Sequence, residues 1–462
     1  MKRRTILKAG LGWSPLLPLG SLAAGQSAQK NTAQVLVIGA GIAGLAATRK
    51  LHDIGLDVIV LEARDRTGGR IHTYANWRGP AVDIGASWIH GAGLSNPVAR
   101  LARKIGARTV TTDAEKAELY NGDSTMLSVR DEKKIDSIRK EISEVIAEQS
   151  RRGPDSSLRK LVYAETDYDT RPPLEQRIID FTLNSNFEHE YSGSADQLSR
   201  LWFDDGSSYA GDEAIFLDGY QVITNALAAG LDIRLRHEVS AVHYGDKDGV
   251  TVETSQGVFN AGMAIVTLPL GVLKASNIRF TPTLPSQKQA AISQLGFGVL
   301  NKYCLLFPET FWNANLDWLN HLPRTGHAGE WAEWVSFARS TGKPILMGFN
   351  AAEFGSKIEA WSDEKAIQSA VSILSTMFGR PIPMPVDAVI TRWKSDPYAR
   401  GSYSFNAVGS TPGQRDDLAR SIAGKVFFAG EATDKKYYQT VHGAYQSGLR
   451  AADEILKLNI PR

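Results

Sequence analysis

The stretch that decides the fold is Val35–Arg70, VLVIGAGIAGLAATRKLHDIGLDVIVLEARDRTGGR. Val35 to Ile38 are consecutive, apolar and rich in β-formers, which predicts a buried strand. A helix is expected to begin at the glycine-rich turn that follows and to run to about Ile54. Val58 to Leu61 predict a second strand that finishes at Glu62. The stretch therefore predicts a βαβ unit.

The glycines of this unit have the spacing of a dinucleotide-binding turn. Gly39 permits the tight turn, Gly41 lets a pyrophosphate approach the backbone, and Gly44 lets helix and strand pack closely. The helix N-terminus supplies free N–H groups and a partial positive charge for phosphates. Glu62, about 20 residues further on, can accept hydrogen bonds from a ribose. The unit predicts a dinucleotide site and leaves nicotinamide and flavin open.

The residues after Glu62 favour a flavin. ARDRTGGR, from Ala63 to Arg70, adds a second glycine turn with further arginines, which a simple nicotinamide site would not need. It looks like the second half of an FAD-binding fingerprint. Near the other end of the chain, Val426 to Ala429 predict a short strand, followed by GEAT at Gly430 to Thr433 and a turn into a helix. That helix would bring a second N-terminus to the cofactor.

With two further motifs, the chain resembles the flavin-containing amine oxidases, and within them the polyamine oxidases and flavin-dependent histone lysine demethylases. The motifs are GASWIHG at Gly85–Gly91 and RWKSDPYARGSYSF at Arg392–Phe405. The resemblance runs from about Gln34 to Leu456. It implies an α/β fold, with a discontinuous Rossmann-like FAD-binding domain and an α+β substrate domain. The expected segments are 33–87, 213–281 and 388–462 for the FAD-binding domain, and 88–212 and 282–387 for the substrate domain.

The resemblance implies FAD contacts along most of the chain. In monoamine oxidases the position of Ser402 carries a cysteine bonded to the flavin, whereas the single cysteine here, Cys304, lies in another segment. FAD is therefore expected to be bound without a covalent link. A single cysteine also excludes an internal disulfide and a cysteine-cluster metal site. The implied contacts are Gly39, Gly41, Gly44, Glu62, Arg64, Gly69, Arg70, Ala86, Trp88, Val239, Trp393, Glu431 and Val441.

Two residues are expected to be catalytic. Lys302, in VLNKYCLLF, has the position of the family lysine that holds a water near the flavin ring. Alternation along a strand puts it on one face with Leu300 and Cys304. From spacing alone, Lys302 would be a surface lysine whose ammonium reaches solvent. Tyr403 would form one wall of an aromatic cage that orients the amine, and a core tyrosine is its alternative.

Three residues are expected to bind substrate. Thr440 is expected at the opposite wall of the cage. Its small side chain argues for an open site and against small aryl amines as substrates. His90 matches a histidine of animal and fungal polyamine oxidases. Glu188, in NFEHEY, aligns with an acid that faces the polyamine channel of plant enzymes. A polyamine needs carboxylates along its path because each distant ammonium keeps its charge. Further candidates are Glu190, Asp204 and Asp205.

The implied reaction is oxidation of an amine to an imine and then an aldehyde, with oxygen reduced to hydrogen peroxide. A polyamine such as spermidine or spermine is the favoured substrate. An L-amino-acid oxidase or another monoamine oxidase is the enzymatic alternative, but an amino-acid oxidase should need an arginine to clamp the substrate carboxylate. A flavin-binding electron-transfer module is the alternative without turnover. The presence of Lys302 and Tyr403 disfavours it.

The first 28 residues resemble a twin-arginine export signal. Arg3 and Arg4 precede an apolar stretch, Ile6 to Ala24, that two prolines interrupt, so it is too broken to span a bilayer. A periplasmic or secreted protein without a stable membrane span is expected, and a membrane anchor or an ordinary secretory signal stays open. Four basic residues and no acid lie in this segment, which leaves 48 basic and 50 acidic residues, a net charge of −2. Nothing in that balance predicts nucleic-acid binding.

Three weaker patterns also predict secondary structure. Residues 131–149 predict an amphipathic helix whose isoleucines, Ile135, Ile138 and Ile142 among them, pack in a core or lid. Val250 to Val258 alternate like one solvated strand, and Ala264 to Leu268 predict a separate buried strand.

Overall fold

A computed structural model of the chain describes residues 30–122, 127–247 and 249–458. The expected export signal lies outside these residues. From Thr32 onward the described chain forms one compact unit. None of its described helices combines the length and the apolar character needed to cross a membrane.

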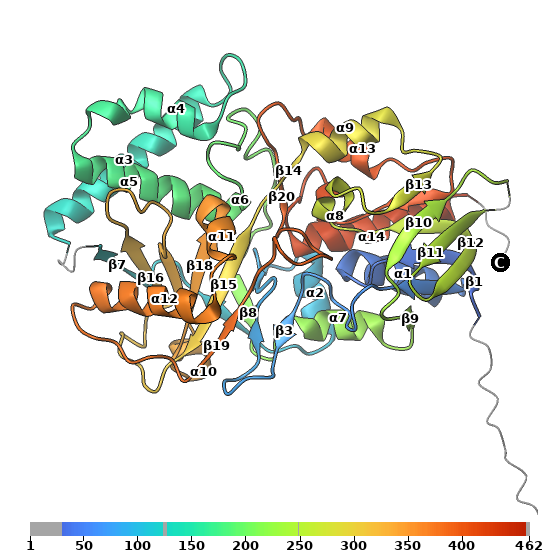
Figure 1. The fold of residues 1–462 in the computed structure, drawn as a ribbon, viewed down its shortest axis with the longest axis horizontal. Coiled ribbons are helices and arrows are strands. Elements are labelled where there is room, and N and C mark those ends of the chain that lie inside the picture. Colours follow the sequence, from blue (N-terminus) through green and yellow to red (C-terminus); the bar gives the residue numbers. More distant parts are fainter. Residues whose placement is uncertain (1–29, 123–126, 248, 459–462) are drawn as a thin grey trace, which may run out of the picture. The chain divides into compact units, whose positions relative to one another are not determined.

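The first sheet contains the βαβ unit, which is confirmed. Its eight strands follow the order β13-β10-β11-β12-β1-β2-β9, with β21 beside β12, and β1 pairs in parallel with both β2 and β12. It lies on the right of Figure 1. The elements are β1 (Thr32–Ile38), α1 (Ile42–Asp53), β2 (Val58–Leu61), β9 (Asp232–Arg234), β10 (Val239–His243), β11 (Val250–Thr254), β12 (Gly257–Val266), β13 (Arg279–Thr281) and β21 (Val426–Phe428).

Packing on both faces explains the uninterrupted apolar run of β1. Val35 and Val37 pack with α1 and with α14 (Val441–Leu456), whereas Leu36 and Ile38 pack against β10, β11 and β12. Neither set of alternating residues meets water. Helices α1 and α14 approach closely, because a Cβ added to Gly448 would lie 2.1 Å from the carbonyl oxygen of Ala43.

The expected strand from Val250 to Val258 is wrong. The chain turns at Ser255 and Gln256, where Thr254 pairs with Gly257, so β11 and β12 form a hairpin. Strand β12 then continues to Val266, and the expected strand starting at Ala264 is its end rather than a separate element. The prediction counted Val258 with Val250 and Val252 because of their even spacing, and overlooked the turn-forming residues Ser255 and Gly257 between them.

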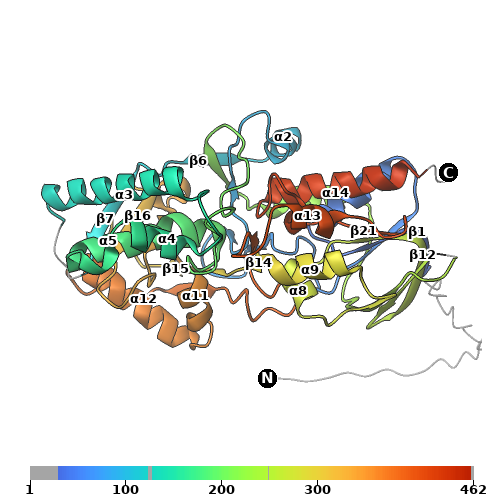
Figure 2. The same cartoon turned by 90° about the horizontal axis from the view of Figure 1, so that it is seen from above.

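The second sheet has six strands in the order β19-β15-β18-β17-β16-β7. Helix α12 packs on one face through Ala366, Ala370 and Leu374, and Figure 2 shows α12 and α3 on opposite sides of the strands. The elements are β7 (Ala117–Asn121), β15 (Leu300–Leu306), β16 (Trp318–Leu322), β17 (Glu333–Ser336), β18 (Ile345–Ala351), β19 (Asp387–Ile390), α11 (Ala352–Ile358) and α12 (Asp363–Met377).

A group of helices beside the second sheet contains the isoleucine stripe. Ile135, Ile138 and Ile142 are at most 3% exposed and pack with Ile178 and Phe181, so the predicted amphipathic helix is confirmed as a core element. The group consists of α3 (Val129–Gln149), α4 (Leu158–Glu165), α5 (Pro173–Leu183), a π-helical turn (Asn184–Glu188) and α6 (His189–Tyr191).

Short elements connect the two sheets. A three-stranded sheet, β5-β8-β6, and the pairs β3-β4 and β14-β20 lie outside both large sheets. The strands of the first sheet fall in the segments expected for the FAD-binding domain, but the division into two domains stays a prediction. The remaining elements are β3 (Thr73–Tyr74), β4 (Val82–Asp83), β5 (Trp88–Ile89), β6 (Thr109–Thr112), β8 (Glu213–Phe216), β14 (Gly296–Phe297), β20 (Ser404–Phe405), α2 (Pro97–Lys104), α7 (Gln221–Ala228), α8 (Leu270–Lys274), α9 (Ser286–Gln294), α10 (Ala338–Thr341) and α13 (Gly413–Ala419).

Candidate active site

A cavity of about 1230 Å³ extends from the first sheet to the second. Ile38 and Leu61, at the carboxyl ends of β1 and β2, line it at one end, and Trp318 and Phe349 of the second sheet line it at the other. Drug-sized ligand pockets usually measure about 300 to 1000 Å³. The cavity therefore has room for a large cofactor and a substrate together.

The glycine turn leaves space for a phosphate group. Gly41 lines the cavity and begins α1 without a side-chain cap, and no atom lies within 4 Å of the position a Cβ would take. The first turn of α1 contains no acid. Gly39 has φ of +105°, and a Cβ on Gly44 would lie 2.0 Å from the carbonyl oxygen of Gly39. This turn fits the pyrophosphate of a dinucleotide.

Glu62 and Arg64 are held in place beside this turn. The Glu62 carboxylate is 6% exposed and accepts hydrogen bonds from the backbone N–H groups of Ala40, at 2.7 Å, and Arg64, at 2.8 Å. The guanidinium of Arg64 forms two hydrogen bonds with the Asp396 carboxylate, at 2.9 and 2.8 Å. Both side chains line the cavity in orientations that neighbouring segments fix.

Arg70 and Glu431 join three of the motifs that carried the resemblance. Arg70 Nη1 donates to the carbonyl of Ser402 at 2.7 Å and to the Glu431 carboxylate at 2.9 Å. Glu431 also accepts from Ser404 Oγ at 2.6 Å. Burial by itself would raise the pKa of Glu431, but the charge of Arg70 and these hydrogen bonds lower it below 4.5. The carboxylate therefore stays ionised in the interior.

The structure brings nearly all expected cofactor residues to the same cavity. Gly44 is the exception, since it packs against the turn of Gly39 instead. The cavity-lining members of the expected set are Gly39, Gly41, Glu62, Arg64, Gly69, Arg70, Ala86, Trp88, Val239, Trp393, Glu431 and Val441.

Lys302 lies inside the cavity wall and not at the outer surface. It is 5% exposed, and its Nζ donates to the carbonyl of Gly85 and to Ser87 Oγ, both at 2.5 Å, and to the carbonyl of Asp83 at 3.3 Å. Burial lowers the pKa of Lys302 from 10.5 to about 8 against the opposing charge of Asp83. A lysine with such a pKa exchanges protons near neutral pH.

Tyr403 and Thr440 both line the cavity. The Tyr403 hydroxyl donates to the carbonyl of His189 at 2.6 Å, and burial, with the charges of Glu190 and Glu333, raises its pKa well above 10. The phenol is therefore neutral. Thr440 caps α14, since its Oγ accepts from the N–H of Gly443 at 2.9 Å, so its hydroxyl also has a structural role.

His90 forms a pair with Glu213 of β8, with Nδ1 and Oε2 2.6 Å apart. Its side chain is 53% exposed and lines the cavity. Burial would lower the pKa of His90, but the hydrogen bond and charge of Glu213, with a contribution from Glu190, raise it above 6.5.

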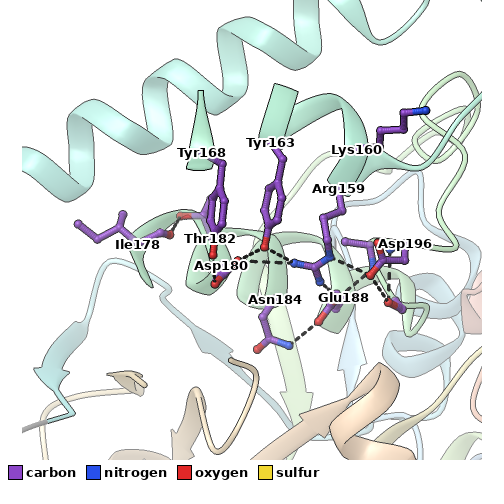
Figure 3. Close-up of polar contacts among 12 residues, drawn as sticks. Arg159, Lys160, Tyr163, Tyr168, Ile178, Asp180, Thr182, Asn184, Glu188 and Asp196 are labelled. Atoms are coloured by element: carbon purple, nitrogen blue, oxygen red, sulfur yellow. Dashed lines mark hydrogen bonds and ion pairs between the residues drawn. The ribbon is translucent and has the colours of Figure 1, made fainter. Parts of the chain in front are cut away.

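The structure places Glu188 outside the cavity lining, contrary to the expectation for it. The side chain is 7% exposed, and its carboxylate accepts from Arg159 Nη2 at 3.0 Å, from the N–H of Ala195 at 2.9 Å and from Asn184 Nδ2 at 2.8 Å. Figure 3 shows Glu188 within this network of polar side chains. Arg159 satisfies the carboxylate and holds it away from the cavity, whereas Glu190, two residues later, lines it.

Several other residues that line the cavity were not predicted from the sequence, or were only further candidates. Glu190 and Asp204 line the cavity and Asp205 does not, while Glu213 and Glu333 were not foreseen. Two aromatic residues were also missed: Trp318, whose ring stacks on Trp88 at 5.9 Å, and Phe349. They come from separate strands without a local motif, so only an alignment of whole chains could have found them.

The βαβ turn and the cavity that it lines define an α/β protein with a dinucleotide-binding site. The chain belongs to the family described as flavin containing amine oxidoreductase, whose model matches residues 42–456.

The chain is similar to two relatives in sequence and to a further protein in fold. Polyamine oxidase 2 of Arabidopsis thaliana is 33% identical over 446 residues, covering 93% of this chain and 89% of its own. Lysine-specific histone demethylase 1 homolog 3 of Oryza sativa subsp. japonica is 35% identical over 443 residues, covering 91% of this chain. This chain spans only 54% of that relative's length. Putrescine oxidase bound to putrescine shares the fold, with a TM-score of 0.74, 21% identity and coverage of 92% of this chain and 99% of the other.

Proposed function

We propose that this protein oxidises a polyamine such as spermidine or spermine to an imine, which hydrolyses to an aldehyde, with oxygen reduced to hydrogen peroxide. One observation carries the proposal: apart from Glu62, Glu238 and Glu431, which lie in or beside the segments expected to contact FAD, four carboxylates line the cavity. They are Glu190, Asp204, Glu213 and Glu333. Several acids around one chamber suit a substrate with several positive charges, because each ammonium taken from water needs a partner. Similarity to polyamine oxidase 2 over nearly its full length supports this substrate class.

The residues around the glycine turn would hold FAD. The N-terminus of α1 at Gly41 suits the pyrophosphate, Glu62 a ribose, and Arg70 with Glu431 fixes the segment beside it. FAD, when bound, supplies the acceptor for a hydride equivalent from the carbon beside nitrogen and passes the electrons to oxygen. We propose that it is bound without a covalent link, since Cys304, the chain's only cysteine, is fully buried and outside the cavity lining.

The chain's own residues orient the amine and handle protons. Tyr403 offers a neutral ring face to the amine. We assign Lys302 Nζ to exchange protons with a water near the flavin, which its lowered pKa permits near neutral pH. Trp88, Trp318 and Phe349 provide an apolar wall for the methylene segments between the nitrogens.

An amino-acid oxidase is disfavoured by the arginines of the cavity. Among the described residues, those lining it are Arg64 and Arg70, and each already binds a carboxylate of the protein, Asp396 or Glu431. A substrate carboxylate would have to compete with these pairs. The four acids would also repel it.

The test is peroxide release from the purified holoenzyme. Spermidine, spermine and putrescine are compared with benzylamine and L-amino acids at equal concentration. Rapid peroxide release with a polyamine is expected. A holoenzyme silent toward every polyamine but active on a monoamine or amino acid would refute the substrate, and silence toward all amines would favour the electron-transfer module.

We also propose that the protein is exported by the twin-arginine route to the periplasm or beyond. Arg3 and Arg4 ahead of an interrupted apolar stretch support this. FAD bound by three separate segments also favours a route that carries folded proteins, because the cofactor must be inserted before export.

A further inference from the structure

Four side chains join separate segments at the end of the cavity nearest Glu62. They form the rim group, which consists of Arg64, Asp396, Tyr398 and Glu238. All of them except Asp396 line the cavity. Arg64 follows β2, while Asp396 and Tyr398 lie in the loop after β19. Glu238 directly precedes β10. The rim group therefore joins all three of the segments expected for the FAD-binding domain.

The contacts of the rim group run in series from one segment to the next. The guanidinium of Arg64 holds the Asp396 carboxylate through its two hydrogen bonds. The same carboxylate accepts the backbone N–H of Tyr398 at 2.9 Å, and the Arg64 guanidinium lies 5.4 Å from the centroid of the Tyr398 ring. The Tyr398 hydroxyl then donates to Glu238 Oε2 at 3.1 Å. The series therefore connects the loop after β19 to the start of β10.

The backbone places the Glu238 end of the series beside Glu62. The N–H of His237 donates to the carbonyl of Glu62 at 2.8 Å, and Glu238 follows directly. A carboxylate in the position of Glu62 suits the ribose of the adenosine half of FAD. The hydrogen bond between Tyr398 and Glu238 is exposed to solvent, so it lies at the rim of the cavity. This rim is the one nearest the expected adenosine.

The two halves of the rim group differ in strength. The side chains of Arg64 and Asp396 are only 14% and 22% exposed, and a double hydrogen bond between such charged groups is strong. The Tyr398–Glu238 contact is a single, exposed hydrogen bond. Burial, with the charge of Glu238, raises the pKa of Tyr398 above 10, so its hydroxyl stays a donor at neutral pH. The weaker contact can therefore open while Asp396 keeps the loop attached.

We propose that the rim group forms a gate over the adenosine end of FAD, in which the Tyr398–Glu238 hydrogen bond opens before the cofactor can leave. The Arg64–Asp396 pair keeps the loop attached when that hydrogen bond is open. The gate slows the loss of FAD from the protein. This inference concerns cofactor retention and does not depend on which amine is oxidised.

The rate of FAD release from the purified holoenzyme tests the gate without turnover. Free FAD is trapped by an excess of an unrelated apo-flavoprotein, and release is followed by flavin fluorescence. Tyr398→Phe removes only the hydroxyl and should speed release about fivefold, the effect of one exposed hydrogen bond to a carboxylate. Glu238→Ala should speed it by a similar factor. Glu238→Gln keeps an acceptor for the hydroxyl and should keep most of the slow release.

The double variant Tyr398→Phe/Glu238→Ala separates a gate from two independent contacts with FAD. If both side chains act through the bond between them, the double variant should release FAD no faster than either single variant, about fivefold faster than wild type. Two independent contacts would multiply to about 25-fold.

Tyr120→Phe is the matched control. The Tyr120 hydroxyl of β7 donates to Glu118 Oε2 at 2.5 Å, an exposed tyrosine–carboxylate bond like that of the rim group. Neither residue is among the described residues that line the cavity. This control makes the same chemical change elsewhere and should leave the rate of FAD release unchanged.

Multiplied effects in the double variant would overturn the gate, as would unchanged release from Tyr398→Phe. Faster release from Tyr120→Phe by the same factor would overturn it as well, because the protein would then loosen wherever such a bond is lost. A holoenzyme that oxidises no polyamine would refute the proposed function and leave these release rates as they are.

Discussion

Lys302→Met separates the catalytic role of a buried lysine from its effect on stability. The lowered pKa of Lys302 means that the folded state disfavours the ammonium relative to the unfolded chain. With pKa values of about 8 folded and 10.5 unfolded, the charge destabilises the protein by about 3 kcal/mol at pH 8 and about 1 kcal/mol at pH 10. The sign follows from linkage: this group makes the protein more stable as pH rises through this window, because the unfolded state binds more protons.

Methionine removes the charge and also the three hydrogen bonds that Nζ donates. Loss of these hydrogen bonds offsets part of the stability gained by removing the charge. This loss does not vary with pH in the variant. The unfolding free energy of Lys302→Met relative to wild type should therefore fall by about 2 kcal/mol from pH 8 to pH 10. Peroxide release should fall about a hundredfold or more, as expected for loss of a proton-transfer group.

The assay is urea unfolding at both pH values, with peroxide release measured on the same preparations. Lys288→Met is the matched control. Lys288 is also buried, burial lowers its pKa to about 7, and its Nζ donates to the carbonyls of Asp417 and Leu418, outside the cavity lining. This control should show a pH-dependent stability difference but keep its activity. A stability difference for Lys302→Met that is the same at both pH values would refute the reasoning, as would full activity.

Three further predictions concern the cofactor and export. Gly44→Ala should destabilise the protein by about 2 to 3 kcal/mol, because its Cβ would lie 2.0 Å from a backbone oxygen. Gly41→Ala has open space around its Cβ, so it should unfold like wild type but bind less FAD. Equal unfolding midpoints for the two variants would contradict this prediction. Acid precipitation should release the flavin into the supernatant from wild type and Cys304→Ser alike, and colour retained in the pellet would contradict non-covalent binding. Replacing both Arg3 and Arg4 by lysine should leave the protein in the cytoplasm, and unchanged export in cell fractionation would refute the twin-arginine route.

The predicted residues that line the cavity include a group that one short segment defines. The glycine turn needs only the order strand, turn, helix, strand and acid, so Gly39, Gly41 and Glu62 could be assigned from 36 consecutive residues. The hairpin of β11 and β12 was misread because the even spacing of Val250, Val252 and Val258 outweighed the turn-forming residues between them.

The glycine turn of this protein follows from local pattern, because the backbone geometry of a βαβ turn depends on residues next to one another in the chain. The direction in which each acidic side chain points does not follow from local pattern. Glu188 is turned away from the cavity by Arg159, 29 residues earlier, and His189 pairs with Glu333 of β17. Contacts between distant segments decide which carboxylate is satisfied and which faces the cavity, and such contacts exist only once the chain has folded.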